Sequence, residues 1–230
     1  GPIHGPAFWT LFMLLAFGFP LGRMKRGPGP VLRLLKVAGA YYFAVFEFGC
    51  LLLPPADIAG WLLMKSGYGP DIHVGVPGAA VLAVLAVLFA LGSYNAWSAV
   101  VREYRLEVAK EAGDLRKLRI LAASDLHLGN IVGNRHLRRL IREAHKRRPD
   151  LILLAGDVID DDIEPFIRKR MDRTLAELNA PCGVYAVLGN HEYYGGQIEA
   201  WVRLAADAGI RVLRDETATI GGRFHIAGRK

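Results

Sequence analysis

The sequence has few cysteines, and its first hundred residues carry little charge. The chain of 230 residues holds two cysteines, Cys50 and Cys182. Two cysteines so far apart form neither a disulfide framework nor a cysteine-based metal site. Residues 1–100 contain six of the 29 Lys and Arg residues and three of the 22 Asp and Glu residues. This scarcity argues against a soluble fold there, so we expect a membrane anchor at 1–100 and a globular domain at 101–230.

Three segments of the anchor are expected to be transmembrane helices. Residues 74–97 are mostly Ala, Val, Leu and Gly without a charged side chain, and they are long enough to cross a hydrocarbon core of about 30 Å. Residues 37–53 form a second candidate, interrupted by Glu47 and ended by a Pro-Pro pair. Residues 3–21 form a third candidate, weakened by two prolines.

The basic residues near the ends of these segments predict their orientation. The loop after the first segment carries five Lys or Arg residues, the loop after the second carries only Lys65, and the region after the third is basic again. Loops rich in Lys and Arg stay on the cytoplasmic side of a membrane. With three spans, the amino terminus is expected outside and the globular domain in the cytoplasm.

The globular half alternates apolar, β-prone runs with helical segments, which predicts an α/β fold with a largely parallel sheet. Strands are expected at residues 101–108, 118–123, 151–155, 184–188, 210–213 and 224–227. Helices are expected at 134–147, with Asn134 as the N-cap, and at 164–178 and 198–208. The helix at 134–147 is rich in Lys and Arg, which indicates either a solvated face or a surface docked on anionic lipid.

Polar motifs follow three of these strands. They are Ser124-Asp125-Leu126-His127, Gly156-Asp157 and Gly189-Asn190-His191-Glu192. The carboxyl ends of parallel strands form the ligand-binding edge of a sheet, so two Asp, two His and one Asn are expected to converge there. The Asp-x-His pair is expected to project from one side of an extended strand end, and the glycines are expected to permit tight turns. Such side chains ligate hard or borderline metal ions, which predicts a two-metal phosphoryl-transfer site.

With these motifs, residues 118–228 closely resemble the calcineurin-like metallophosphoesterase superfamily. The matching residues are Asp125-x-His127, Gly156-Asp157 followed by Asp160, and Gly189-Asn190-His191-Glu192. The strings Ser-Asp-Leu-His-Leu-Gly and Gly-Asn-His-Glu-Tyr-Tyr are similar to the membrane-anchored bacterial branch. The resemblance implies that the expected transmembrane helices are followed by part of an α/β sandwich domain in a bacterial inner-membrane protein, and the basic loops described above place the catalytic domain in the cytoplasm.

The resemblance also implies a role for each motif residue. Asp125 and His127 would hold a first metal, Asp157 would bridge, and Asn190 would hold a second. Asn190 and His191 would bind the substrate, and His191 would stabilise the transition state or protonate the leaving oxygen. The cofactors would be two divalent ions of Mn, Fe or Zn, and a metal-activated hydroxide would hydrolyse a phosphodiester or phosphomonoester. The anchor favours a phospholipid or lipid-linked substrate, and no specific nucleic acid is predicted.

One departure from the family pattern keeps alternatives open. The family's later Gly-His and Gly-His-x-His segments are missing, since His191 and His225 are the histidines after Asn190. We therefore expect a chain that stops partway through its catalytic domain, with weak metal binding and little or no turnover of its own. A tethered enzyme for soluble phosphoesters and a non-catalytic membrane sensor or scaffold with a degenerate domain are the alternatives. The acidic run 160–162 is expected to be a solvated turn, and Glu192 is expected to support His191 or its loop rather than to bind metal.

Overall fold

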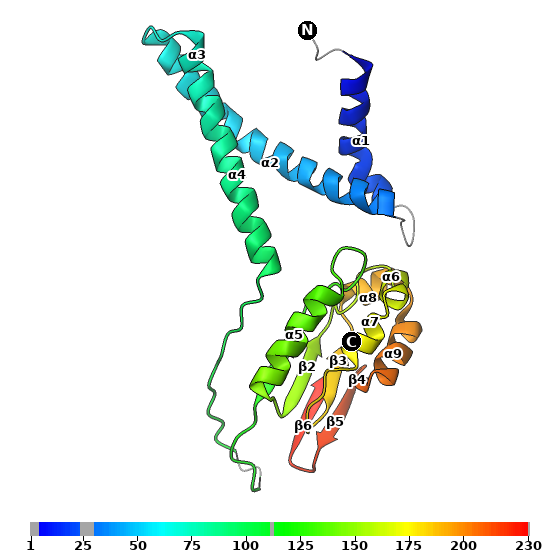
Figure 1. The fold of residues 1–230 in the computed structure, drawn as a ribbon. Helices are drawn as coiled ribbons and strands as arrows, with labels where there is room; N and C mark the ends of the chain where they lie inside the picture. The colour runs from blue at the N-terminus through cyan, green and yellow to red at the C-terminus, as the bar shows by residue number, and fades with distance from the viewer. Residues whose placement is uncertain (1–4, 24–29, 111–112, 230) are drawn as a thin grey trace. The chain divides into compact units, whose positions relative to one another are not determined.

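The structure is a computed structural model that describes residues 5–23, 30–110 and 113–229. The chain divides into two compact units, Gly1–Ala99 and Val100–Lys230 (Figure 1). Residues 3 and 4 of the first expected span and residues 24–29 of the basic loop lie outside the described residues. The first unit is helical, whereas the second contains strands and helices.

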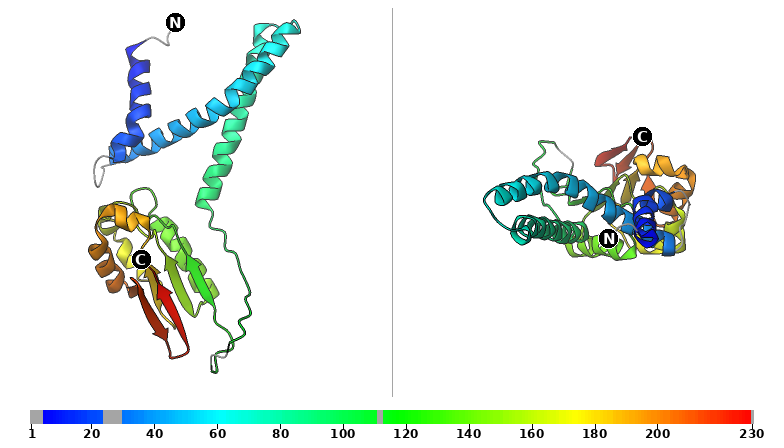
Figure 2. Two further views of the ribbon diagram at one scale, coloured as in Figure 1. Left: turned by 180° about the vertical axis from the view of Figure 1, so that it is seen from behind. Right: turned by 90° about the horizontal axis from the view of Figure 1, so that it is seen from above.

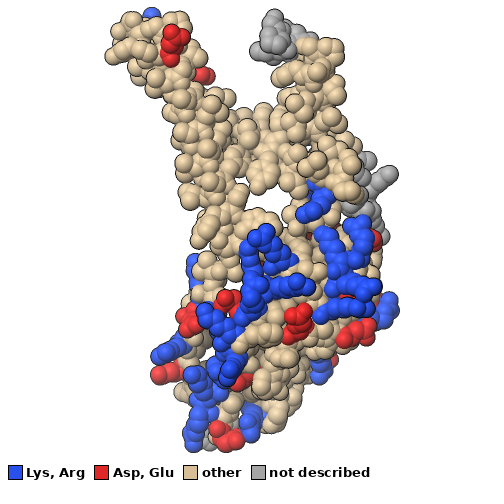
Figure 3. Space-filling view, in the orientation of Figure 1, with Lys and Arg blue, Asp and Glu red and all other residues tan. Residues whose placement is uncertain are grey.

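The first unit consists of apolar helices. They are α1 (Pro6–Arg23), α2 (Pro30–Lys65), α3 (Pro70–His73) and α4 (Gly75–Trp97). Two segments, Arg33–Lys65 and Pro70–Trp97, are long and apolar enough to cross a membrane, while Pro6–Leu21 is apolar but shorter. Only 6% of each long segment is buried, and Figure 3 shows few charged side chains on these helices. Exposed apolar helices of this length are typical of a membrane protein rather than of a soluble core.

The predicted end of the second span at Pro54-Pro55 is wrong, because α2 continues through both prolines to Lys65. Apolar residues flank the prolines on both sides, and membrane helices tolerate proline where the freed backbone groups find other partners.

Glycines allow α1 and α2 to cross closely. A Cβ at Gly18 would lie 2.7 Å from the Leu35 carbonyl oxygen, and one at Gly39 would lie 2.4 Å from the Phe19 nitrogen.

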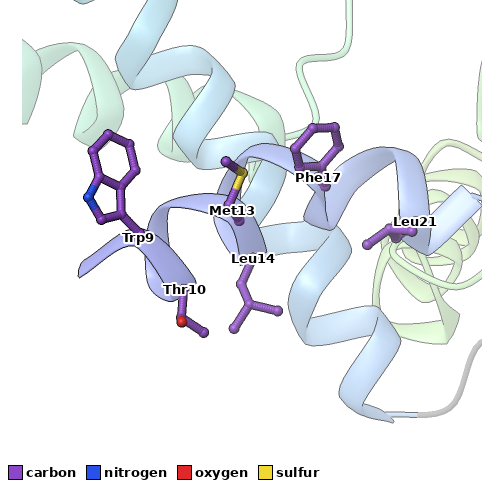
Figure 4. Close-up of a pocket in the computed structure, with 6 residues that line it drawn as sticks. All are labelled: Trp9, Thr10, Met13, Leu14, Phe17 and Leu21. Carbon is purple, nitrogen blue, oxygen red and sulfur yellow. The ribbon is translucent and has the colours of Figure 1, made fainter. Parts of the chain in front are cut away.

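A shallow groove runs along α1 (Figure 4). Its lining residues are Trp9, Thr10, Met13, Leu14, Phe17 and Leu21. The hydroxyl of Thr10 donates a hydrogen bond to the Pro6 carbonyl oxygen at 2.9 Å. The Thr10 hydroxyl is therefore satisfied within the helix, as a surface in contact with lipid requires.

The second unit is built on a four-stranded parallel sheet in the order β1-β2-β3-β4. The strands are β1 (Ile120–Ala123), β2 (Leu151–Ala155), β3 (Val184–Val187) and β4 (Ile210–Val212). The helices are α5 (Asn134–Arg147), α6 (Glu164–Arg168), α7 (Met171–Leu175), α8 (Asn190–Gly195) and α9 (Ile198–Asp207). The predicted α/β class with a parallel sheet is confirmed.

Helices α5, α7 and α9 cover one face of the sheet (Figure 1), and the hydrophobic core lies between these helices and the sheet. Ile152 and Leu154 of β2 pack there with Phe166 and Trp201, all with 1% exposure or less. The opposite face, seen in Figure 2, carries the antiparallel hairpin of β5 (Glu216–Ile220) and β6 (Phe224–Gly228). This hairpin packs on the β3 side of that face, against Tyr185.

Three expectations for the second unit are wrong. Residues 101–108 form no strand, and Leu106 is 86% exposed. A strand needs a hydrogen-bonding neighbour, and no described segment pairs with these residues. The expected helix at 164–178 is two short helices, because Arg170 adopts a positive φ of 51° between them. The N-cap of α5 is Gly133 rather than Asn134, whose side-chain nitrogen instead donates to the Lys169 carbonyl oxygen at 2.9 Å.

Candidate metal centre

The loops that follow β1 and β2 are joined by backbone hydrogen bonds. The nitrogen of Asp125 donates to the Gly156 carbonyl oxygen at 3.2 Å, and that of His127 donates to the Asp157 carbonyl oxygen at 2.9 Å. Asp125, His127 and Asp157 have φ values of 55°, 44° and 50°, in a region of backbone conformation that residues other than glycine rarely adopt. The expectation that the Asp-x-His segment is extended is therefore wrong. The left-handed turns direct alternate amides toward the neighbouring loop while keeping both side chains at the same edge.

The loops after β2 and β3 meet at two glycines. A Cβ at Gly156 would lie 2.9 Å from the Gly189 Cα atom. A Cβ at Gly189 would lie 2.2 Å from the Asp157 Oδ1 atom and 2.4 Å from the Asp157 nitrogen. No side chain fits at either position without a shift of the backbone. The absence of side chains therefore brings Asp157 to the start of α8, where Asn190 and His191 lie.

The side chain of Glu192 connects the loops after β2 and β3 through hydrogen bonds to their backbone. Its side chain is buried, with 1% exposure. Its Oε2 atom accepts hydrogen bonds from the nitrogens of Asp157 at 3.1 Å and Gly189 at 2.7 Å, and its Oε1 atom accepts one from the Ile159 nitrogen at 3.0 Å. The expectation that Glu192 supports its loop is confirmed by these three bonds.

Five titratable side chains of these loops form two overlapping clusters with metal-ligand spacing. One cluster contains Asp125, His127 and Asp157, the other contains His127, Asp160 and His191, and the ligand atoms within each lie within 4.8 Å of one another. The ring centroids of His127 and His191 are 4.4 Å apart, and the rings are nearly perpendicular. The backbone N–H of His191 donates a hydrogen bond to Asp157 Oδ1 at 2.9 Å. Carboxylate and imidazole ligands in this number suit divalent Mn, Fe or Zn.

The acidic run 160–162 was expected to be only a solvated turn, but two of its carboxylates lie beside His191, and Asp160 belongs to one of the clusters. The Nδ1 atom of His191 lies 2.8 Å from Asp161 Oδ1 and 3.6 Å from Asp160 Oδ1. Asp160 also has a turn role, since its Oδ1 accepts a hydrogen bond from the Asp161 nitrogen at 3.0 Å. Their position in the sequence could have indicated this role, because both acids follow β2 in the same loop as Asp157 and therefore lie at the same sheet edge.

Asn190, the fourth predicted metal ligand, is not titratable and therefore belongs to neither cluster of titratable residues. It is exposed and is the first residue of α8, between Gly189 and His191. The structure thus places all five predicted residues in the three loops at the carboxyl edge of the sheet. Their assignment to individual metal ions stays a prediction.

Comparison with known proteins identifies the second unit. Residues 118–223 match the family of calcineurin-like phosphoesterases. The chain contains a calcineurin-like metallophosphoesterase domain. It is 30% identical over 182 residues to a zebrafish protein described as a transmembrane protein with metallophosphoesterase domain, covering 77% of this chain and 40% of the relative. This coverage exceeds the second unit alone, so the similarity reaches into the apolar helices.

Two bacterial relatives are informative as well. The chain is 35% identical over 150 residues to an uncharacterized metallophosphoesterase of Aquifex aeolicus, covering 63% of this chain and 54% of the relative. It is 35% identical over 85 residues to the UDP-2,3-diacylglucosamine pyrophosphatase of Chlamydia muridarum, covering 36% of this chain and 25% of the relative. The chain therefore spans about half or less of the length of these curated relatives. The predicted resemblance to the metallophosphoesterases is confirmed.

Proposed function

We propose that the protein is a membrane-anchored phosphoesterase that uses two divalent metal ions to hydrolyse a phosphodiester or phosphomonoester. The observation that carries this proposal is the pair of clusters with metal-ligand spacing that share His127 and draw their side chains from three loops. In this proposal, residues 1–100 are the membrane anchor and residues 101–230 belong to the catalytic domain.

The residues present fit a pair of divalent ions. Asp125 and His127 would hold one ion, Asn190 would hold the other, and Asp157 would bridge because a carboxylate has two oxygens. When bound, two such ions clamp a phosphate and lower the pKa of a water molecule that then serves as the nucleophile. The hydrogen bond from the His191 nitrogen to Asp157 Oδ1 keeps the bridging carboxylate in a fixed orientation.

His191 is assigned to the substrate rather than to a metal. Its Nδ1 atom faces the carboxylates of Asp160 and Asp161, which favours a proton on that nitrogen and fixes the orientation of the ring. When both ring nitrogens carry a proton, Nε2 can donate a hydrogen bond to a phosphoryl oxygen and give its proton to the leaving oxygen, which leaves the ring neutral with the proton on Nδ1. A positioned general acid of this kind contributes about 10²- to 10⁴-fold to a rate.

A phospholipid or lipid-linked phosphoester is the favoured substrate. The Chlamydia relative is named for a diacylated sugar nucleotide, and the apolar helices of this chain would hold the domain near a bilayer. The basic loops of the sequence favour a cytoplasmic domain at a bacterial inner membrane. A soluble phosphoester as the better substrate would show that the anchor only tethers the enzyme.

The test measures metal binding and hydrolysis separately. The full-length protein that contains this chain is reconstituted in nanodiscs and loaded with Mn²⁺, bound metal is counted after removal of free ions, and hydrolysis of a generic aryl phosphodiester is followed. We expect two Mn²⁺ per chain, weakened binding in Asp157→Asn, and full binding with about 10²- to 10⁴-fold slower hydrolysis in His191→Ala. Asp207→Asn, an exposed acid at the end of α9, is the matched control.

Two outcomes would contradict the proposal. Unchanged metal binding in Asp157→Asn would show that the loops do not form the metal centre. Two bound ions without hydrolysis of either aryl or lipid phosphoesters would favour a non-catalytic sensor or scaffold.

A further inference from the structure

Exposed apolar side chains of the second unit gather at one edge. Among the described residues from 113 onward, the exposed large apolar side chains are Ile120, Ile131, Ile167, Tyr193 and Tyr194. All but Ile120 come from the loop before α5, from α6 or from α8, which follow the carboxyl ends of β1, β2 and β3. Figure 1 shows these three segments at the same end of the unit. Single exposed apolar residues are ordinary, but their concentration around one site indicates an interaction surface.

Arginines accompany these apolar residues. Arg138 in the second turn of α5 and Arg170 between α6 and α7 are exposed, and neither forms an ion pair with another described residue. The exposed acid of α6, Glu164, is paired with Arg168, with 3.9 Å between Oε1 and Nε. Figure 3 shows Lys and Arg side chains gathered over the face that contains α5. Arg138 and Arg170 thus present unpaired positive charge beside the apolar side chains, while the carboxylates of the same edge belong to the loops of the candidate metal centre.

We propose that Ile131, Ile167, Tyr194, Arg138 and Arg170 form a docking rim that binds the surface of an anionic lipid bilayer. Apolar and aromatic side chains that enter the acyl boundary, combined with Arg and Lys that contact anionic headgroups, are the features of an interfacial binding surface. A nucleic acid would use the arginines but would leave Ile131 and Ile167 without a role. The bilayer is the occupant that uses both sets.

The apolar helices of the same chain would bring the second unit close to a bilayer, and the segment after α4 is long enough to serve as a tether. Two helices are long and apolar enough to span a bilayer. The described residues 98–110 that follow α4 contain no helix or strand, and an extended chain reaches about 3.3–3.6 Å per residue. Such a connection lets the carboxyl edge of the sheet reach the membrane surface without constraining its orientation.

Docking through this rim would turn the candidate metal centre toward lipid headgroups. Tyr194 is 72% exposed, and its ring centroid lies 5.8 Å from that of His191. A headgroup phosphate at the interface would therefore meet the general acid directly beside a membrane-inserted tyrosine. This consequence for the substrate rests on the proposed function, whereas the docking itself does not.

The experiment places a polarity-sensitive dye at opposite ends of the sheet. In the full chain with Cys50→Ser and Cys182→Ser, the dye is attached to Ile131→Cys or to the control Asn179→Cys, which lies before the amino end of β3. The chain is reconstituted in nanodiscs of phosphatidylcholine alone or mixed with phosphatidylglycerol. We expect a blue-shifted emission and quenching by lipid-soluble quenchers only for the dye at position 131, only with phosphatidylglycerol, and reversal by salt.

Neutralising the arginines tests the electrostatic part. The double variant Arg138→Gln/Arg170→Gln should lower the ratio of docked to undocked domain about 25-fold, because each basic residue near an anionic surface contributes on the order of fivefold. Arg203→Gln, the same change at an exposed arginine of α9, should leave the ratio unchanged. A dye at Ile167→Cys provides a second probe should the substitution at position 131 disturb its loop.

Three results would overturn the docking rim. They are no response to phosphatidylglycerol, an equal response at position 179, and a dye already shielded in phosphatidylcholine, which would show that protein covers the rim. The measurement needs neither metal nor turnover, so docking should persist in Asp157→Asn. Hydrolysis without docking would refute only this inference, and docking without hydrolysis would refute only the proposed function.

Discussion

Replacing Glu192 by Gln tests whether the candidate metal centre depends on a buried hydrogen-bond hub. The carboxylate accepts three backbone N–H groups, two at Oε2 and one at Oε1. A glutamine has one carbonyl oxygen, and its amide nitrogen can only donate. The best arrangement keeps the oxygen at the Asp157 and Gly189 amides and turns the NH₂ group toward the Ile159 amide, which leaves two donors facing each other.

The cost follows from the number of bonds lost. One hydrogen bond to a charged group is worth about 1.5–3 kcal/mol, and the two remaining bonds lose their charge assistance. We therefore expect the loop of Ile159 to lose about 2–3 kcal/mol of local stability in Glu192→Gln. The loss should open the connection between the loops of Asp157 and Gly189, so bound Mn²⁺ should weaken as well.

Hydrogen exchange measured by mass spectrometry provides the assay, because local opening free energies appear directly as exchange rates. A loss of 2–3 kcal/mol corresponds to roughly 30- to 150-fold faster exchange of the Ile159 amide. The control is Glu199→Gln, which removes an exposed partner of Arg214 and should change stability by less than about 1 kcal/mol. Unchanged exchange at Ile159 in Glu192→Gln would refute the hub.

Two further predictions concern packing and pH. Gly189→Ala places a methyl group 2.2 Å from Asp157 Oδ1, so we expect a loss of about 1–3 kcal/mol by urea unfolding and weakened Mn²⁺ binding; Gly133→Ala, whose Cβ would lie 3.8 Å from Met171 Cε, should show neither. The N–H donated by Arg119 to Asp150 Oδ2 at 2.7 Å lowers the pKa of Asp150 in the folded state. Its contribution to the unfolding free energy is therefore complete above the unfolded pKa of about 3.9 and is lost as the pH falls through the folded pKa. Urea unfolding between about pH 2 and pH 6 should show a shallower acid decline in Asp150→Asn, and an identical decline would contradict this prediction.

Much of the fold could be predicted because the sheet follows from local patterns. The strands β2 and β3 are runs of apolar residues with 0% to 4% exposure at Leu151, Ile152 and Val184, and buried parallel strands have this composition. Helix α5 has the bounds expected from its apolar stripe of Leu137, Ile141 and their neighbours. The hairpin strand β5, Glu216–Ile220, was missed because its Glu-Thr-Ala-Thr-Ile sequence is largely polar and only Ala218 and Ile220 are buried.

The detail of the metal centre could not be predicted because it depends on contacts between loops. Positive φ values at Asp125, His127 and Asp157 are local strain, of order 1–3 kcal/mol each. The hydrogen bonds from the neighbouring loop and the Glu192 hub oppose that strain. No propensity of the isolated segments indicates such turns, because their compensating partners lie some 30 residues away along the chain.

The break between α6 and α7 shows the same competition with magnitudes that decide it. A continuous helix would avoid the left-handed conformation of Arg170, which costs roughly 1–2 kcal/mol. In the broken form, the Lys169 ammonium donates to the carbonyl oxygens of Gly129 at 2.9 Å and Asn130 at 2.8 Å. Each of these charge-assisted bonds contributes about 1.5–3 kcal/mol, so together they exceed the cost of the turn. The lysine thereby holds the loop that follows His127, and its two bonds offset the left-handed turn that divides this segment into α6 and α7.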